Sequence, residues 1–152
     1  MLTIPPQKLK ELLVKEGLIA TEKFDDLCIE AQRMNQNVID LLISHGFISA
    51  DYFYNLIAQY LNVDRVYLTN QIIDENILKK LSEELAKQKR TIIFGQESDG
   101  TFDAAMEDPG DLETIEFLEK HLQGKIKVFL ATPNDLARAF SIYGQKSAEE
   151  FK

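Results

Sequence analysis

Apolar residues near the start of the chain recur at the spacing of amphipathic helices, and the whole pattern occurs twice. Leu9 to Gln32 and Val38 to Leu61 align at an offset of 29 positions. The identical pairs are Leu12 and Leu41, Leu13 and Leu42, Gly17 and Gly46, Ile19 and Ile48, Phe24 and Phe53, and Leu27 and Leu56. Self-similarity at a fixed offset indicates that one structural unit is used twice.

Each copy of the repeat predicts a helical hairpin. In the first copy, Leu9, Leu12 and Leu13 form the apolar stripe of a short helix. Gly17 is predicted to end that helix, because glycine takes the left-handed conformation without steric cost. A second helix is predicted to begin near Thr21, and the second copy follows the same plan with Ser49 as the cap. Each hairpin has an apolar side that packing against the other would bury.

Beyond Asn62, strand-like and helix-like patterns alternate. The predicted strands are Val63–Leu68, Arg90–Gly95, Thr101–Met106 and Ile126–Ala131. The first predicted helix is Asp74–Gln88. The second is capped by Asp111, has the apolar stripe Leu112, Ile115, Leu118 and Leu122, and is ended by Gly124. The last begins at a Thr132/Asp135 capping box and runs to Tyr143. Asp99-Gly100 predicts a hairpin turn between the second and third strands.

These elements predict an α+β fold. Its N-terminal helical lobe, residues 1–62, consists of two repeated helical hairpins at 9–32 and 38–61. A small mixed α/β lobe follows over residues 63–143, and residues 144–152 are predicted to be a polar tail or the start of a linker.

Composition narrows the classes of function. The 152 residues carry a net charge of −8, which argues against binding to nucleic acid, since phosphate contacts need clustered Lys and Arg. No apolar run approaches the ~20 residues that span a membrane, so direct membrane insertion is not expected. The start of the chain lacks the pattern of an export signal, which predicts a cytoplasmic protein.

Candidate catalytic and metal-binding groups are few, and the sequence predicts that the chain is not an enzyme. Gly95 and Gly100 stand at P-loop spacing, but Thr101 and Phe102 occupy the positions of the required Lys and hydroxyl. A hairpin loop explains this segment better, and no Walker A motif occurs elsewhere. The single cysteine, Cys28, lies on an apolar helix face, and with His45 and His121 it offers no ligand spacing for zinc.

The order of several motifs resembles the N-terminal domain of type II secretion and type IV pilus assembly ATPases. These motifs are LLVKEGLI, LLISHGFI, RTIIFG, AMEDPGDLE and VFLATPNDLARAF, and together they run from about Lys8 to Tyr143. AMEDPGDLE, Ala105 to Glu113, is the most specific of them.

The resemblance implies a non-catalytic docking or regulatory domain that binds cytoplasmic parts of an inner-membrane platform. In that family the domain precedes a hexameric motor, through which oligomers form. This sequence has no motor motif, so it is expected to be either an excised domain or a stand-alone relative, and both alternatives remain open. Recruitment to the inner membrane would come from the protein partner.

The resemblance also implies an alternative function, sensing of cyclic di-GMP. In some members, tandem 24-residue motifs with a five-residue spacer bind this nucleotide, and the repeat here has the same dimensions. The positions that the resemblance assigns to the ligand are Lys8, Leu9, Lys10, Leu13, Gln32, Val38 and Leu42.

The family's Arg-Leu-Gly triplet aligns with Lys8-Leu9-Lys10 in the first copy and with Asn37-Val38-Ile39 in the second. Neither copy keeps the planar arginine fork or the glycine that lets a ligand approach the backbone. The main prediction is therefore a packed scaffold without a cofactor or a metal.

Overall fold

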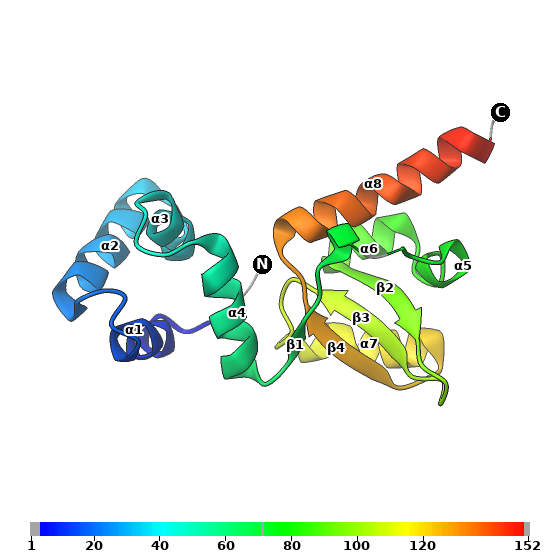
Figure 1. Cartoon of the computed structure of the whole chain (residues 1–152), viewed down its shortest axis with the longest axis horizontal. Coiled ribbons are helices and arrows are strands. Elements are labelled where there is room, and N and C mark those ends of the chain that lie inside the picture. Colours follow the sequence, from blue (N-terminus) through cyan, green and yellow to red (C-terminus); the bar gives the residue numbers. More distant parts are fainter. Residues whose placement is uncertain (1–3, 71, 151–152) are drawn as a thin grey trace. The chain divides into compact units, whose positions relative to one another are not determined.

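The computed structural model describes residues 4–70 and 72–150, and these form two compact units. One unit ends at Leu56 and the other begins at Ile57, so both draw on the helix α4 (Figure 1). The predicted α+β class is confirmed. The lobe boundary that the sequence predicts after Asn62 falls just beyond the end of α4 and stays a prediction, and Phe151 and Lys152 lie outside the described residues.

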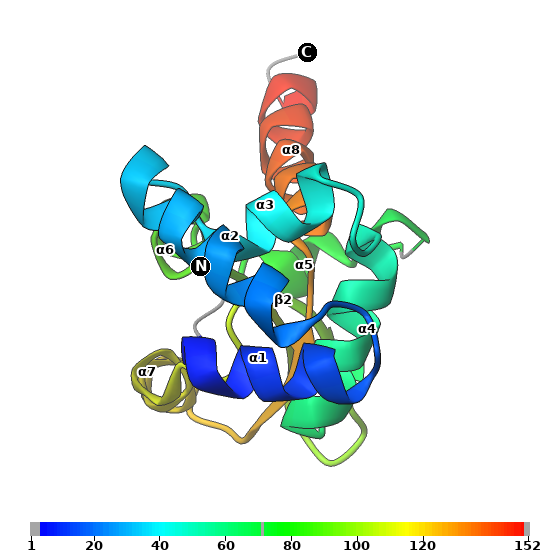
Figure 2. The same cartoon turned by 90° about the vertical axis from the view of Figure 1, so that its left-hand side faces the viewer.

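The helical unit follows the repeat closely. Its elements are α1 (Pro6–Lys15), α2 (Thr21–Met34), α3 (Val38–Ser44) and the first part of α4 (Ala50–Leu61). Figure 2 shows these helices following one another along the chain. Equivalent residues are buried in both copies. The pairs are Leu13 and Leu42, Ile19 and Ile48, Phe24 and Phe53, and Leu27 and Leu56.

The turns inside the two copies have the same backbone geometry. Gly17 and Gly46 take φ angles of +71° and +78°, and a Cβ added to either would meet no atom within 4 Å. Glycine is therefore required here for its conformation and not for space. In the second copy, the Ser49 Oγ accepts a hydrogen bond from the Tyr52 N–H at 3.2 Å, which confirms the predicted cap of α4.

The second unit is built on a four-stranded sheet. Its strands are β1 (Asp64–Arg65), β2 (Thr91–Gln96), β3 (Phe102–Met106) and β4 (Ile126–Leu130), in the order β1-β4-β3-β2. β4 pairs in parallel with both β1 and β3, and β2 pairs antiparallel with β3. The remaining elements are the 3-10 helix η1 (Leu68–Asn70), α5 (Glu75–Leu78), α6 (Glu83–Lys89), α7 (Leu112–Leu122) and α8 (Pro133–Glu150).

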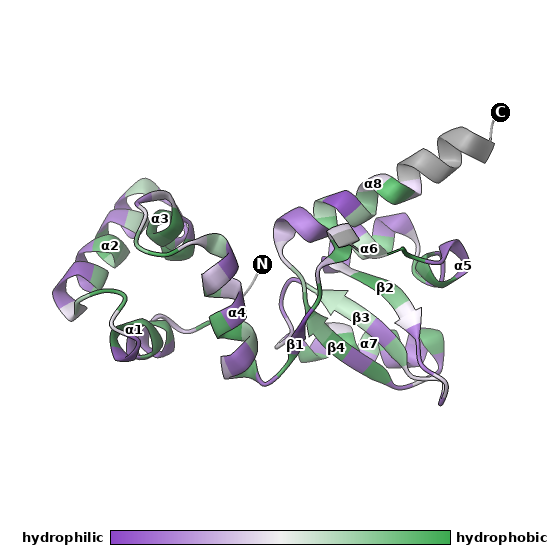
Figure 3. Cartoon of the chain, viewed as in Figure 1, coloured by the Kyte–Doolittle hydropathy of each residue, from purple (hydrophilic) through white to green (hydrophobic). Residues whose placement is uncertain are grey.

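Apolar residues from the sheet and these helices form the core of the second unit. Ile92, Ile93, Ala104 and Ala105 of the sheet are fully buried with Leu118 of α7. In Figures 1 and 2, α7 lies on one side of the sheet, and Figure 3 shows apolar and polar residues alternating along the surrounding helices. That alternation is what half-buried helices require.

Three local predictions for α7 and α8 are wrong in detail. Leu112 is predicted to belong to the core stripe of α7 but is 69% exposed, while Thr114 and Leu118 are buried. The left-handed residue that ends α7 is Gln123, and Gly124 instead gives room to Phe102, whose ring would lie 3.1 Å from an added Cβ. The last helix continues beyond Tyr143 to Glu150.

The predicted single helix over Asp74–Gln88 is divided into α5 and α6. Ser82 begins α6, since its Oγ accepts a hydrogen bond from the Leu85 N–H at 3.3 Å. Tyr143 of α8 stabilises the division: its hydroxyl lies 3.0 Å from the Leu78 carbonyl oxygen and 2.9 Å from that of Leu81. A residue far along the chain thus supplies a donor where the helix is interrupted.

Tyr143→Phe should lower the free energy of unfolding by about 1 to 3 kcal/mol, because the buried Leu81 carbonyl loses a donor. Burial, followed by the charge of Glu83, raises the pKa of Tyr143 to about 12 from 10.0. The folded state therefore holds the hydroxyl proton of Tyr143 more tightly than the unfolded state does. The contribution of this hydroxyl to the free energy of unfolding is complete below the ordinary pKa and is lost as pH rises towards the folded pKa.

The measurement is denaturant unfolding at neutral pH and across this alkaline range. The wild type and Tyr143→Phe should converge as pH rises, while Tyr52→Phe, at a tyrosine that is 47% exposed, should match the wild type throughout. A constant difference between the wild type and Tyr143→Phe at every pH would contradict the assignment.

Candidate functional site

The first Arg-Leu-Gly position falls inside a helix. Lys8 lies in the first turn of α1, is exposed, and approaches Glu11 at 3.9 Å. Lys10 reaches across to α2, where its Nζ lies 3.0 Å from Asp25 Oδ1. One of the two cations that could meet a nucleotide phosphate therefore already has a carboxylate partner on the neighbouring helix.

The second copy uses the equivalent positions differently. Asn37 precedes α3, and its Oδ1 accepts a hydrogen bond from the Ile39 N–H at 2.7 Å. Ile39 is buried and Val38 is half-buried. At the place where the family motif has an arginine, this copy has a helix cap, so the two copies do not offer equivalent donors.

The apolar positions assigned to the ligand lie in the core of the helical unit. Leu9, Leu13 and Leu42 are each 1% exposed. Leu9 and Leu13 share one face of α1, and Leu42 belongs to α3, while Gln32 is exposed near the end of α2. The structure thus gives the three leucines a packing role, and their assignment to a ligand stays a prediction.

The segment with P-loop spacing is a β-hairpin loop, as predicted. The Glu97 N–H donates to the Thr101 carbonyl at 2.8 Å, and the Thr101 N–H donates to Asp99 Oδ1 at 2.9 Å. Gly100 has a φ angle of +93°. The hydrogen bond from the Thr101 backbone is the main reason that the pKa of Asp99 lies below its ordinary value.

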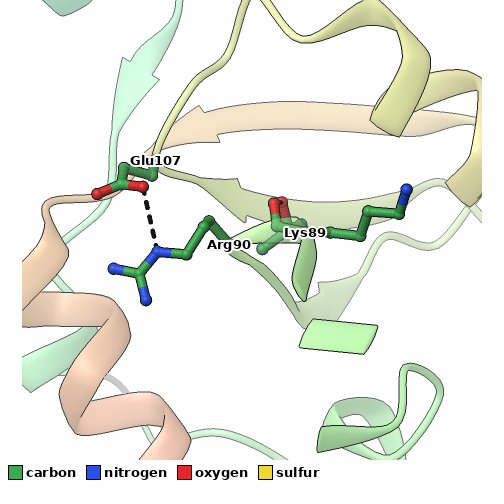
Figure 4. Close-up of polar contacts among 4 residues, drawn as sticks. Lys89, Arg90 and Glu107 are labelled. Atoms are coloured by element: carbon green, nitrogen blue, oxygen red, sulfur yellow. Dashed lines mark hydrogen bonds and ion pairs between the residues drawn. The ribbon is translucent and has the colours of Figure 1, made fainter. Parts of the chain in front are cut away.

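The motif AMEDPGDLE fixes the end of β3 and the start of α7. Figure 4 shows Arg90 pointing towards Glu107, with Nε 3.1 Å from Oε2. The Glu107 N–H also donates to the Arg90 carbonyl at 3.1 Å, so the two residues are joined through both backbone and side chains. The Arg90 guanidinium additionally lies 5.5 Å from the centre of the Phe140 ring.

The aspartates of the same motif satisfy backbone N–H groups. Asp108 Oδ1 accepts from the Gly110 N–H at 3.1 Å, and Asp111 Oδ1 accepts from the Thr114 N–H at 3.2 Å. The Thr114 hydroxyl donates to Asp111 Oδ2 at 2.7 Å, and this hydrogen bond is the main cause of the lowered pKa of Asp111. The most specific motif of the sequence therefore has a structural role as a turn and a helix cap.

The remaining candidate groups are Cys28, His45 and His121. Cys28 is half-buried, and burial followed by the charge of Asp25 raises its pKa, so the thiol is a poor nucleophile. His45 approaches Glu30 at 3.9 Å, and His121 stacks on Phe117. Across residues 4–70 and 72–150, no group of three or more His, Cys, Asp or Glu side chains could hold a metal ion.

An open recess of about 360 Å³ at the end of α7 is lined by Glu116, Glu119, Lys120, Gly124 and Lys125, a set of mixed charge with no convergent catalytic pair. Within the described ranges, no helix has the length and apolar character of a membrane span.

Asp103 on β3 is a polar residue that the sequence analysis did not single out. Its Oδ1 is buried and has no hydrogen-bond partner among the residues that the structure describes. Gly95 lies opposite, and a Cβ there would come within 2.9 Å of Asp103 Oδ2. A glycine inside a strand can mark such a close approach, and that was the signal available in the sequence.

Comparisons with known proteins agree with this geometry. The family model described as the MshEN domain matches residues 61–150. A solved structure of MshE with cdg, an abbreviation for cyclic di-GMP, is similar at a TM-score of 0.76 and 29% identity, covering 89% of this chain and 97% of that chain. The search of curated proteins found no match.

Two crystal forms of the N-terminal domain of XpsE share the fold. Their TM-scores are 0.64 and 0.54 at 18% and 16% identity, and each comparison covers 93% of this chain and 97% of the other. The resemblance inferred from the motifs is confirmed. The chain belongs to the MshEN domain family and is an N-terminal domain of the type found in type II secretion and type IV pilus assembly ATPases.

Proposed function

We propose that this chain is a non-catalytic docking domain that binds cytoplasmic parts of the inner-membrane platform of a secretion or pilus system. The observation that carries the proposal is the match to MshE over both units, which spans 97% of that chain. The domain acts in the cytoplasm and reaches the membrane through its protein partner. Hydrolysis of ATP belongs to a motor domain and not to these residues.

The use of polar groups within the chain supports a scaffold. The carboxylates of the AMEDPGDLE motif bind backbone N–H groups or Arg90, and the Asn37 amide oxygen caps α3. Side chains committed to local structure are poor catalysts, since an active site needs convergent groups that face a substrate. Exposed residues that take no part in these local hydrogen bonds are available to bind a protein partner.

The docking proposal is tested by calorimetric titration of the chain with purified cytoplasmic fragments of the platform proteins encoded near its gene. Saturable binding of one fragment is expected, at a dissociation constant of roughly 10⁻⁶ M or tighter. An ATPase assay of the chain alone should give no turnover. Absence of binding to every platform fragment would overturn the docking role.

Binding of cyclic di-GMP is the second candidate, because the similar MshE structure was determined with this nucleotide. The residues proposed to meet it are Lys8, Leu9, Lys10, Leu13, Gln32, Val38 and Leu42. Against binding stand the Lys10–Asp25 ion pair and the cap made by Asn37. Each missing bidentate arginine contact removes about 1 to 3 kcal/mol of recognition.

We expect titration of the wild-type chain with cyclic di-GMP at high micromolar concentration to give no saturable heat. The two lost arginine forks are the physical reason, and GTP serves as the control nucleotide. Saturable heat that Lys8→Ala abolishes, with GTP inert, would instead establish this chain as a cyclic di-GMP sensor.

A further inference from the structure

The hairpin end of the sheet brings an acid and two aromatic rings onto one face. Gly95, Asp103 and Lys127 are direct neighbours across β2, β3 and β4. Phe129 lies two residues from Lys127 on the same strand, so it points to the same face. Phe94 is the extra residue of a bulge between Ile93 and Gly95, and its ring meets Phe129 edge-on with centroids 5.1 Å apart.

Asp103 lies in a niche that the backbone makes for it. The absence of a side chain at Gly95 is what admits the carboxylate, since an added Cβ would lie 2.9 Å from Oδ2. Burial, and then the charge of Glu97, raises the pKa of Asp103 above its ordinary value. Holding an ionised carboxylate here therefore costs free energy, because one of its oxygens is buried without a hydrogen bond. Such an arrangement in a folded protein often has a function.

The aromatic part of the face already accepts a cation. Lys127 is the cross-strand neighbour of Asp103, yet its Nζ lies 5.1 Å from the centre of the Phe129 ring. Phe94, Phe129 and Asp103 are all partly exposed, and Lys127 is exposed. Figure 3 shows hydrophilic residues at this end of the β2–β3 hairpin, beyond the apolar centre of the sheet.

We propose that the face formed by Phe94, Gly95, Asp103, Lys127 and Phe129 binds an arginine side chain presented by a protein partner. A guanidinium group is planar, so it can stack on a phenylalanine ring and donate to a carboxylate in the same pose. The Asp103 residue is partly exposed, so a guanidinium group of a partner can approach its carboxylate from outside the niche.

Charge complementarity selects this occupant. Glu97 and Asp99 lie at the same end of the hairpin as Asp103, so three carboxylates face the single ammonium group of Lys127. After burial, the charge of Glu97 raises the pKa of Asp103, Lys127 lowers it and Asp99 raises it. The site has too few carboxylate or imidazole ligands for a metal ion within the described ranges. A lysine ammonium can pair with the carboxylate but lacks the flat surface that matches the exposed ring.

This inference rests on the docking function proposed above, since it specifies what the partner presents. It is tested by nuclear magnetic resonance titration of the folded chain with the blocked peptide acetyl-Gly-Arg-Gly-amide, and with its lysine and citrulline counterparts. Saturable amide shifts at Phe94, Asp103 and Lys127 are expected for the arginine peptide. Weaker binding is expected for the lysine peptide and none for the citrulline peptide.

Asp103→Asn should weaken binding of the arginine peptide about tenfold or more, as expected for a lost charge-assisted hydrogen bond. Asp99→Asn removes the same charge from the same hairpin and should change the affinity by less than about twofold, because Asp99 lies outside the niche. Phe129→Leu should weaken binding with Asp103 intact. Equal losses in Asp103→Asn and Asp99→Asn, or shifts elsewhere on the chain, would overturn the proposal.

The same variants then enter the titration with the platform fragment. If wild type and Asp103→Asn bind the fragment equally well, docking stands and the arginine site is wrong. If the peptide binds in an Asp103-dependent way while no fragment binds, the site stands and the docking function is wrong.

Discussion

Phe53→Ala should lower the free energy of unfolding of the helical unit by about 3 to 5 kcal/mol. The Phe53 side chain is fully buried, and its ring contacts that of Tyr54 edge-on with centroids 5.4 Å apart. Its repeat equivalent, Phe24, is 1% exposed, so Phe24→Ala should have a similar cost. A unit of this size has little stability beyond that amount, so either change should leave α1 to α3 largely unfolded.

Amide hydrogen exchange followed residue by residue measures this effect. Protection should be lost across α1, α2 and α3 and retained in β2 and β3, because the core of the second unit contains neither phenylalanine. Ile29→Ala, at a site that is 64% exposed on α2, should stay within about 0.5 kcal/mol of the wild type. Unchanged protection in Phe53→Ala would show that the helical unit does not depend on this packing.

Arg90→Met should destabilise the second unit by about 3 kcal/mol or more, and Glu107→Gln should cost clearly less. The asymmetry follows from burial: the Glu107 side chain is 11% exposed and that of Arg90 is 39% exposed. Arg90→Met leaves a buried carboxylate without its arginine, whereas Glu107→Gln leaves a guanidinium that water can still reach. Methionine also preserves apolar contact with Phe140. The fall in the free energy of unfolding therefore comes mainly from the lost charge of Arg90.

Urea unfolding at neutral and mildly acidic pH separates the two effects. Burial opposes ionisation of Glu107, but its hydrogen bonds, the one from Arg90 among them, lower its pKa. The difference in stability between the wild type and Arg90→Met should therefore shrink as pH falls and the carboxylate takes up a proton. The double variant Arg90→Met/Glu107→Gln should be more stable than Arg90→Met alone, since it no longer buries a carboxylate that has lost Arg90. Equal costs for the two single variants would contradict this account.

Local signals in the sequence predicted the features that depend only on neighbouring residues. Gly17 and Gly46 take left-handed conformations because no other residue does so without cost. The Thr132/Asp135 capping box forms, with the Asp135 N–H donating to Thr132 Oγ1 at 3.2 Å. The alternation of strands and helices after Asn62 likewise follows from periodicity within short windows.

Features that depend on distant contacts were not predictable in this way. The break between α5 and α6 preserves the apolar spacing of Ile77, Leu81 and Leu85, so the pattern alone reads as one helix. Tyr143 stabilises the break from more than 60 residues away. Leu112 fits the stripe of α7 by spacing, but it is the first residue of the helix and extends beyond the core.

The candidate sites also combine features that neighbouring residues determine with features that depend on distant contacts. The repeat and its triplets can be read from the sequence, and the pairing of Lys10 with Asp25 on another helix cannot. The niche around Asp103 depends on the register of three strands and on a bulge at Phe94. Gly95, a glycine inside a predicted strand, was the one signal of this niche in the sequence. Spacing alone does not reveal which strands become neighbours.

Within the described residues, four chain reversals place Asn35, Asn62, Arg90 and Gln123 in the left-handed conformation that glycine adopts freely. A non-glycine residue there costs of order 1 kcal/mol, and asparagine less. Glycine in place of Asn35, Asn62 or Gln123 would recover part of that free energy, whereas glycine in place of Arg90 would also remove the ion pair with Glu107. The domain is therefore below its maximum stability, and glycine at these three positions is a direct way to raise the free energy of unfolding.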